Sequence, residues 1–385
     1  MCDSIKPLVT IVIPTRERAD KLKFTLETVL DQENDNFQVV VSDNFSQDNT
    51  KEIVDAFADP RVTYVNTGVR LSMSDNWDFA FKHVQGAYVI YIGDDDGLMP
   101  GAINKLEEMI KTKPSPIYCW ECHEYMWPFD GNPPKIGLIA PVRCSYEIDL
   151  NKITRFSLGW GGLRDHLLPR VYYSAVSSSI LEAIREKTGR VFHSQAPDLF
   201  SGYALPAFSN KAVNVGEALT VIGYSGKTVS AVQRFFREYG NYQFHSTLFP
   251  KAPIAINHIQ DSTLVAMDMF PEFYAKLKFN YEAMWANMVW SGRYQRTLYI
   301  PESKLSSVFH LLCNRKEIRI YHPFRVTSFL FYCLINALLR LRADLKRKIK
   351  GKKIDGYGYG YENDSPQNIY AFVKLVRQIE SQGSI

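Results

Sequence analysis

The sequence of 385 residues has no apolar run long enough to cross a membrane and no pattern of a secretory signal. Its longest apolar stretch, residues 329–339, is far shorter than the roughly 20 residues that a membrane-spanning helix needs. Only six cysteines occur. In a chain of this length without an export signal, they indicate free thiols in a reducing compartment. We therefore expect a cytoplasmic protein.

Familiar cofactor-binding sequences are also missing. Neither Gly-x-Gly-x-x-Gly nor a Walker loop follows the first predicted strand, which disfavours a dinucleotide or P-loop site. The formal net charge is only +4, so the composition gives no indication of nucleic-acid binding. Residues 119–123 read Cys-x-x-Cys-His, but they overlap a predicted core strand and lack a second ligand pair. We expect neither haem nor zinc.

The chain does contain an apolar run that ends in three consecutive carboxylates. Residues 88–92 have the β-branched and aromatic composition of a buried strand, and Asp94, Asp95 and Asp96 follow almost directly. Adjacent carboxylates repel one another, and a divalent cation would supply the missing countercharge. The alternative is an acidic turn that caps the helix predicted to begin at Pro100.

Strand and helix patterns alternate along the first 120 residues. This spacing predicts βαβ units, and hence an α/β fold with a mostly parallel sheet flanked by helices. The predicted strands cover residues 8–13, 37–42, 62–65, 88–92 and 117–120, and the predicted helices cover residues 19–31, 51–58, 74–84 and 100–111.

Polar residues follow several of these strands. Ligands bind at the carboxyl ends of the strands in such a sheet. Because these ends share one edge, we expect their polar residues to line one cleft, with acidic groups for a sugar, a base edge and a metal. These residues are Thr15 and Arg16 after the first strand, Asp43 and Asn44 after the second, and the Asp triplet after the fourth.

Four motifs occur in a fixed order. Residues 9–16 end in Pro-Thr-Arg, and residues 41–50 read Val-Ser-Asp-Asn-x-Ser-x-Asp-x-Thr. Asn66-x-Gly68 with Asn76 comes next, and then the Asp triplet with Pro100. In this order the motifs resemble family 2 glycosyltransferases of the GT-A fold, a Rossmann-like α/β architecture, over about the first third of the chain. The resemblance implies a nucleotide-sugar donor, usually a UDP-sugar, Mg²⁺ or Mn²⁺, and inversion at the anomeric carbon.

The resemblance also implies roles for individual residues. The family sequence Asp-Ser-Asp-Asp is altered here, because Gly93 stands in place of its first Asp. We favour Asp94 near the ribose and Asp96 on the metal, with Asp95 as the alternative. The other expected donor-site residues are Pro14, Thr15 and Arg16 along the nucleoside, Asp43 on the uracil edge, and Asn76.

The second segment should supply a catalytic base. Asp198 follows a proline at a predicted helix start, and the family has a catalytic Asp in this relative position. The alternative is an acidic residue that only stabilises a helix N-terminus. The Gly-rich turn at residues 223–228 would close over the diphosphate with Ser225 and Lys227 as donors, or it is an ordinary loop. We leave His193 out of the metal site.

The last part of the chain has a different character. We expect a GT-A domain over residues 1–250, with a nucleotide-sugar half at 1–120 and an acceptor half at 121–250. A helical region over 251–385 follows. Residues 337–353 have an apolar stripe on a basic background, which is typical either of a helix on an anionic membrane surface or of a core helix with a solvated end. A terminal helix would dock on the body or pair with another subunit.

These patterns together predict an enzyme. We expect an inverting glycosyltransferase of bacterial-type surface polysaccharide synthesis, with a saccharide or lipid-linked acceptor, at the cytoplasmic membrane face. A metal-dependent nucleotidyltransferase is one alternative, but residues 14–18 are not the Gly-rich loop that would hold a triphosphate. The other alternative is an inactive sugar-binding or scaffold protein, against which the intact Asp96 and Asp198 argue.

Overall fold

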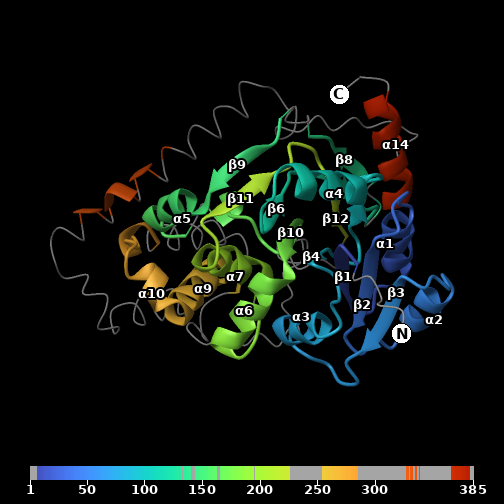
Figure 1. Cartoon of the computed structure of the whole chain (residues 1–385), viewed down its shortest axis with the longest axis horizontal. Helices are drawn as coiled ribbons and strands as arrows, with labels where there is room; N and C mark the ends of the chain where they lie inside the picture. The colour runs from blue at the N-terminus through green and yellow to red at the C-terminus, as the bar shows by residue number, and fades with distance from the viewer. Residues whose placement is uncertain are drawn as a thin grey trace.

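The computed structural model describes most of the chain. The described residues are 7–129, 131, 133–139, 144–162, 165–194, 196–225, 254–284, 327, 328, 330–332, 334, 335, 338 and 366–381. Two sheets and their helices form a mixed α/β structure (Figure 1).

The larger sheet has eight strands and is mostly parallel. The first four strands of the chain pair in parallel, as expected for βαβ units. β10 runs antiparallel to both its neighbours, and β9 is antiparallel to β11. The spatial order is β3 (Val62–Asn66), β2 (Phe37–Asp43), β1 (Val9–Thr15), β4 (Tyr88–Tyr91), β10 (Ser174–Ser177), β6 (Ile117–Cys119), β11 (Lys211–Asn214) and β9 (Tyr146–Asp149).

Helices cover both faces of this sheet because its central strands are apolar on both sides. On β1, Ile11 and Ile13 belong to one core cluster and Val12 to the other, as the alternation of a strand requires. One cluster includes side chains of α1 (Ala19–Leu30), α2 (Thr50–Asp55) and α4 (Ala102–Thr112). The other includes side chains of α3 (Met73–Phe81), α5 (Leu150–Gly159), α6 (Ser178–Thr188), α7 (Pro197–Ala204), α9 (Ile254–Met269) and α10 (Pro271–Tyr274).

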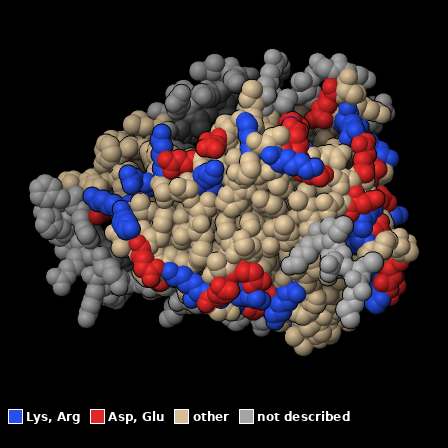
Figure 2. All heavy atoms as spheres, viewed as in Figure 1, with Lys and Arg blue, Asp and Glu red and all other residues tan. Residues whose placement is uncertain are grey.

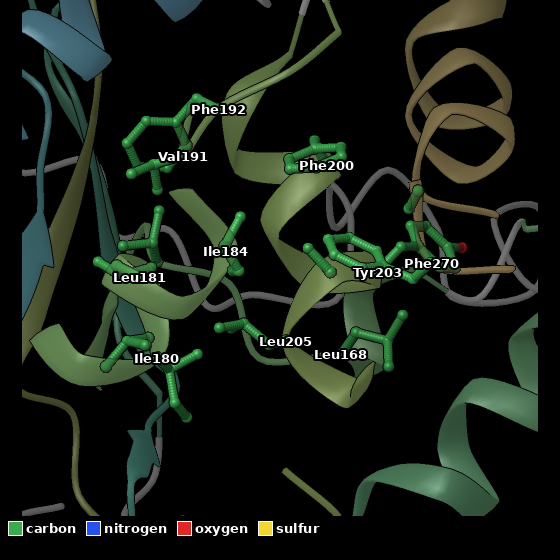
Figure 3. Close-up of a cluster of buried hydrophobic side chains, with 14 of the residues drawn as sticks. Leu168, Ile180, Leu181, Ile184, Val191, Phe192, Phe200, Tyr203, Leu205 and Phe270 are labelled. Carbon is green, nitrogen blue, oxygen red and sulfur yellow. The ribbon is translucent and has the colours of Figure 1, made fainter. Parts of the chain in front are cut away.

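The second core cluster is rich in aromatic side chains. Figure 3 shows Phe200 and Tyr203 of α7 with Phe270, beside aliphatic residues of α6 such as Leu181 and Ile184. All of these are nearly inaccessible to solvent. Their packing holds α7, the helix that begins just before Asp198, in a fixed position over the sheet.

A smaller sheet carries the C-terminal helix. Its strands are β5 (Gly97–Leu98), β12 (Thr220–Tyr224), β7 (Cys122–Met126) and β8 (Lys135–Gly137), in that order. α14 (Ile369–Ser381) packs Phe372 and Val373 into a third cluster with Tyr125 and Trp127. The Tyr125 hydroxyl also donates to the Pro366 carbonyl at 2.7 Å. The terminal helix therefore docks on the body, beside α1 (Figure 1).

The observed elements agree closely with the sequence patterns. The five predicted strands and four predicted helices are all present, and no end is shifted by more than three residues. No helix in the described part of the chain is both long and apolar enough to span a membrane. The domain boundaries near residues 120 and 250 stay predictions. Lys227 and the predicted basic helix at residues 340–353 lie outside the described residues.

On the face that Figure 2 shows, charges of the two signs are not segregated. Figure 2 shows that Lys and Arg alternate with Asp and Glu along the rim of one face, around an uncharged centre. The three carboxylates after β4 are different, because they are only 1–3% exposed. Charge buried to this degree needs partners inside the fold.

Candidate active site

The three carboxylates Asp94, Asp95 and Asp96, here called the acid loop, lie between β4 and β5. They follow the carboxyl end of β4, next to the carboxyl end of β1 in the sheet. The Thr15 hydroxyl donates to Asp94 Oδ2 at 2.7 Å. Thr15 ends β1, so the expected convergence of strand ends on one location is observed.

Arg18 joins the first two carboxylates. Its Nη1 lies 2.8 Å from Asp94 Oδ1 and its Nη2 lies 2.6 Å from Asp95 Oδ2. Burial lowers the pKa of Arg18, but the charges of Asp94 and Asp95 outweigh burial and raise it overall. Burial, together with repulsion from Asp95, raises the pKa of Asp94 to about 6 even though Arg18 opposes the shift. Asp94 and Asp95 are therefore held together by one cation of the chain itself, Arg18.

Asp96 is bound by neutral donors. Its Oδ2 accepts hydrogen bonds from the hydroxyls of Tyr172 at 2.7 Å and Tyr173 at 3.0 Å, and from the backbone N–H of Gly93. Its Oδ1 accepts from the backbone N–H of Gly223 at 2.7 Å. Burial and the Asp95 charge raise the pKa of Asp96 to about 7, while these donors oppose the shift. Asp96 thus ties three segments of the chain together.

The end of β12 closes directly over the acid loop. A Cβ on Gly223 would lie 1.7 Å from the Asp95 carbonyl oxygen, so only glycine permits this approach. The backbone N–H of Ser225 donates to Asp95 Oδ2 at 3.1 Å, and the Ser225 hydroxyl accepts from Arg18. The structure therefore brings Ser225, one of the two predicted donors of the Gly-rich turn, to the acid loop.

The predicted nucleoside residues lie along the same edge of the large sheet. Asp43, at the end of β2, accepts from the Tyr64 hydroxyl at 2.6 Å and from Asn66 Nδ2 at 3.0 Å. Asn76 on α3 accepts from the Ser42 hydroxyl at 2.7 Å. Pro14 and Arg16 are half-buried on either side of Thr15, and the Arg16 backbone N–H points at Asp94.

Asp198 lies in the first turn of α7. Its side chain is 26% exposed, and Oδ2 lies 3.3 Å from Arg170 Nη1. Arg170 also pairs with Asp165. Because the side chain of Asp198 is partly accessible, it can meet a ligand, which the buried acid loop cannot do without rearrangement.

Residues 170–172 connect Asp198 to the acid loop. Arg170 contacts Asp198, whereas Tyr172 donates to Asp96. The Cα atoms of these two residues can be at most about 7 Å apart, because one residue separates them. Between them, the Val171 backbone N–H donates to the Ser201 hydroxyl of α7 at 3.0 Å. One short segment therefore contacts both Asp198 and Asp96.

Several site residues were not expected from the sequence. Arg18, Tyr172 and Tyr173 all contact the acid loop. Arg18 belongs to the charged stretch after the first strand, so its position was a usable signal. The two tyrosines are about 77 residues away along the chain and no local pattern marks them. His193 has a structural role, because its Nε2 pairs with the Thr188 hydroxyl and burial lowers its pKa to about 4.

A divalent cation fits this site by donor chemistry. Buried carboxylate oxygens are the ligands that Mg²⁺ and Mn²⁺ prefer. Within the described residues, Asp95 Oδ1 is the one oxygen of the acid loop's carboxylates with no hydrogen-bond donor, whereas both oxygens of Asp96 have donors. This geometry favours the alternative ligand, Asp95, over Asp96. In the same described part, no three His, Cys, Asp or Glu side chains converge on one metal position, so at most two carboxylates of the acid loop would contact the ion.

The fold and site define a GT-A α/β protein with an acidic ligand site at the strand ends. Residues 10–167 match the model of the family described as glycosyl transferase family 2. The chain is therefore similar to this family over residues 10–167.

Curated relatives resemble part of the chain. The GalNAc(5)-diNAcBac-PP-undecaprenol β-1,3-glucosyltransferase of Campylobacter jejuni is 27% identical over 26% of this chain and 33% of its own length. The putative teichuronic acid biosynthesis glycosyltransferase TuaG of Bacillus subtilis is 26% identical over 37% of this chain and 56% of its own length. The chain thus spans between a third and about half of these two relatives.

A solved structure is similar over most of the chain. The S. aureus TarS fragment 1–349, crystallised with UDP-GlcNAc, has a TM-score of 0.54 and covers 83% of both chains at 13% identity. At this identity the similarity shows the GT-A fold and not the ligand. It extends the shared architecture well beyond residues 10–167.

Proposed function

We propose that the protein is an inverting glycosyltransferase that moves a sugar from a nucleotide-sugar, a UDP-sugar in the first instance, to a saccharide or lipid-linked acceptor. The observation that carries this proposal is that one short segment of the chain contacts two different acidic groups. The acid loop is buried against Thr15, and the more exposed Asp198 is joined to it through residues 170–172. The acid loop can hold a sugar donor, and Asp198 can receive a proton.

The donor would lie along the carboxyl edge of the large sheet. Thr15, Arg16 and Asp94 are in mutual contact there. A nucleoside that replaced some of their present partners would keep these polar groups satisfied. The TarS fragment of similar fold was crystallised with UDP-GlcNAc, which supports a UDP-sugar. The remaining donor-site residues that we propose are Pro14, Asp43, Asn76, Ser225 and Lys227.

Mg²⁺ or Mn²⁺ is the cofactor that we propose for this reaction. Asp95 would hold it, with Asp94 beside it, and Asp96 is the second candidate. When bound, such a cation acts as a Lewis acid that stabilises negative charge on the leaving diphosphate. In the present structure Asp96 accepts hydrogen bonds from Gly223 and Tyr172, which a metal would have to displace in part before Asp96 could bind it.

Asp198 is the general base of the proposed reaction. The acceptor oxygen attacks the anomeric carbon from the face opposite the diphosphate, and its proton passes to an Asp198 oxygen. The bond between the anomeric carbon and the diphosphate oxygen breaks, and its electron pair leaves with the diphosphate. Arg170 Nη1 lies 3.3 Å from Asp198 Oδ2 and helps to fix the direction of this carboxylate.

A lipid-linked acceptor would bring the protein to a membrane. The Campylobacter relative is named for an undecaprenol-linked substrate. In the helical residues between 327 and 338, four apolar side chains are 56–58% exposed and fall within one third of the helix circumference. Basic residues dominate the sequence that follows, which suits an anionic surface. The four are Leu330, Phe331, Leu334 and Leu338.

The transfer reaction tests this proposal directly. A panel of nucleotide-sugars should show consumption of a UDP-sugar by the wild-type protein. Asp198→Asn should lower kcat by about 10²- to 10⁴-fold, the usual contribution of a general base. UDP affinity, measured by calorimetry, should not change. Asp165→Asn is the matched control, because Asp165 contacts the same Arg170. Transfer that survives in Asp198→Asn would remove this residue from the reaction.

Vesicle binding tests the membrane part separately. The full chain should co-sediment with vesicles that contain phosphatidylglycerol and only weakly with neutral phosphatidylcholine vesicles. The double variant Leu330→Asp and Leu334→Asp should stay in the supernatant while it keeps its thermal stability, since both side chains are exposed. Equal sedimentation of this variant would contradict a membrane role for the exposed apolar stripe.

A further inference from the structure

Arg18 places a full positive charge directly on the acid loop. Its guanidinium spans Asp94 and Asp95 at 2.8 and 2.6 Å, and its side chain is only 14% exposed. A bidentate pair of this kind is stronger than a surface ion pair because both partners are largely desolvated. The cation that the acid loop needs in order to fold is therefore already part of the chain.

The backbone around Arg18 is built to hold it in this position. Glu17 has a φ of 54°, in the left-handed region that is unfavourable for a residue with a Cβ. The Glu17 backbone N–H donates to the Ser46 hydroxyl at 2.9 Å, and its carboxylate accepts from the Gln47 backbone N–H at 2.9 Å. The turn after β2 thus fixes the turn after β1, and Arg18 emerges from it toward the acid loop.

The same carboxylates are those that a divalent cation would use. Asp94 has no oxygen without a donor, and Asp95 has one, as described above. An incoming cation that binds both carboxylates must take the place of the guanidinium, because two cations cannot share these oxygens at contact distance without strong repulsion. Occupation by Arg18 and occupation by metal exclude each other.

We propose that Arg18 is the resident counterion of Asp94 and Asp95, and that a divalent cation competes with it for this carboxylate pair. Arg18 keeps the acid loop folded before the donor binds, and it lowers the affinity of the protein for free metal. This inference rests on the proposed function only in taking the cation to be the cofactor of the donor site. Arg18 is a positioning residue, because it acts through Asp94 and Asp95 and not on the reacting atoms.

Manganese titration of the full chain without nucleotide tests the competition. Free Mn²⁺, followed by electron paramagnetic resonance, should show about tenfold tighter binding to Arg18→Gln than to the wild-type protein. Arg61→Gln is the matched control, because Arg61 forms a two-sided ion pair with Asp59 and Asp35 away from the site. Its Mn²⁺ affinity should not change. Equal or weaker binding by Arg18→Gln would overturn the proposal.

Arg18→Lys separates occupation of the carboxylates from simple charge repulsion. Lysine keeps the charge, but one ammonium group cannot span both carboxylates as the planar guanidinium does. A Mn²⁺ affinity between those of the wild type and Arg18→Gln supports displacement, and an affinity equal to that of the wild type contradicts it. If Arg18→Gln does not fold, Arg18→Lys is compared with the wild type alone. Tighter Mn²⁺ binding by Arg18→Lys then supports the proposal.

Thermal unfolding gives a second measurement that does not depend on turnover. In EDTA, Arg18→Gln should have a lower Tm than the wild-type protein, and Mn²⁺ should raise its Tm by more than it raises that of the wild type. A Mn²⁺ response that is no larger than in wild type would count against the proposal. Loss of sugar transfer in Asp198→Asn is independent of these results, so failure of the proposed function and failure of this inference can be told apart.

Discussion

Asp96 and Asp198, which residues 170–172 connect, have opposite surroundings. Asp96 is 1% exposed and accepts hydrogen bonds from two tyrosines and two backbone N–H groups. The Asp198 side chain is 26% exposed and contacts one arginine. A carboxylate surrounded by donors is a structural element, whereas a partly accessible one can accept a proton. The difference shows that acidity alone does not define a role in this site.

The comparison predicts its largest effect for Asp96→Ala. Removal of the carboxylate relieves the repulsion with Asp95, but it leaves the donors of Tyr172 and Gly223 without an acceptor. Buried donors without partners cost about 1–3 kcal/mol each, so the loss outweighs the relief. We expect the free energy of unfolding to fall by about 3–5 kcal/mol in urea denaturation.

Asp198→Ala is the matched variant for this measurement. Because Asp198 is partly exposed and has one ionic partner, the free energy of unfolding of Asp198→Ala should stay within about 1 kcal/mol of that of the wild type. Equal destabilisation of the two variants would show that Asp198 is as structural as Asp96, and the comparison would fail.

The sequence predicted the location of the site better than its internal contacts. Thr15, Asp43 and the acid loop could be placed together, because the carboxyl ends of parallel strands share one edge. The partners of Asp96 could not be found, since Tyr172 and Gly223 reach it from distant segments. Hydrogen bonds between residues so far apart in the sequence depend on tertiary packing, which the local periodicity of apolar residues does not reveal.

The division of metal and ribose contacts within the triplet stays a prediction. The resemblance favoured Asp96 as the metal ligand on its place in a motif. In the structure Asp96 has donors on both oxygens, whereas Asp95 keeps Oδ1 without one among the described residues. The three side chains are chemically identical, so only the direction in which each one points distinguishes them. The backbone of the turn after β4 sets that direction.

Phe372→Ala should give the next largest effect. Phe372 is fully buried in the cluster between α14 and the small sheet, and it stacks on Tyr125. Loss of a buried phenylalanine costs about 3 kcal/mol or more. Since α14 lies against Gly97, directly after Asp96, UDP binding should also weaken. Calorimetry and thermal unfolding measure both effects.

The exposed residue Gln378 of the same helix provides the control for Phe372. Gln378→Ala should leave both stability and UDP affinity unchanged. If Phe372→Ala unfolds more easily but binds UDP as the wild type does, then α14 supports the body and not the acid loop.

Gly223→Ala should have a smaller effect that is specific to the acid loop. The added methyl group would overlap the Asp95 carbonyl oxygen, so β12 must move and its bond to Asp96 must lengthen. Overpacking of this kind costs about 1–3 kcal/mol. Gly159→Ala is the control, because no atom lies within 4 Å of its added Cβ. Normal UDP binding by Gly223→Ala would show that the contact is dispensable.

The smallest effect concerns the segment that leads into α7 and Asp198. Burial, reinforced by Arg190, lowers the pKa of His193 to about 4 from an ordinary value near 6.5. Between these values the unfolded chain binds more protons than the folded one, so stability falls as pH decreases from 6.5 toward 4. His193→Gln should reduce this pH dependence by about 1 kcal/mol.

Denaturation at pH 7 and pH 5 measures the difference between wild type and His193→Gln. The exposed His166 serves as control, and His166→Gln should keep the pH dependence of the wild type. An identical response of both variants would mean that burial of His193 does not matter. A reduced response only in His193→Gln would show that mild acid weakens the segment before α7 through His193.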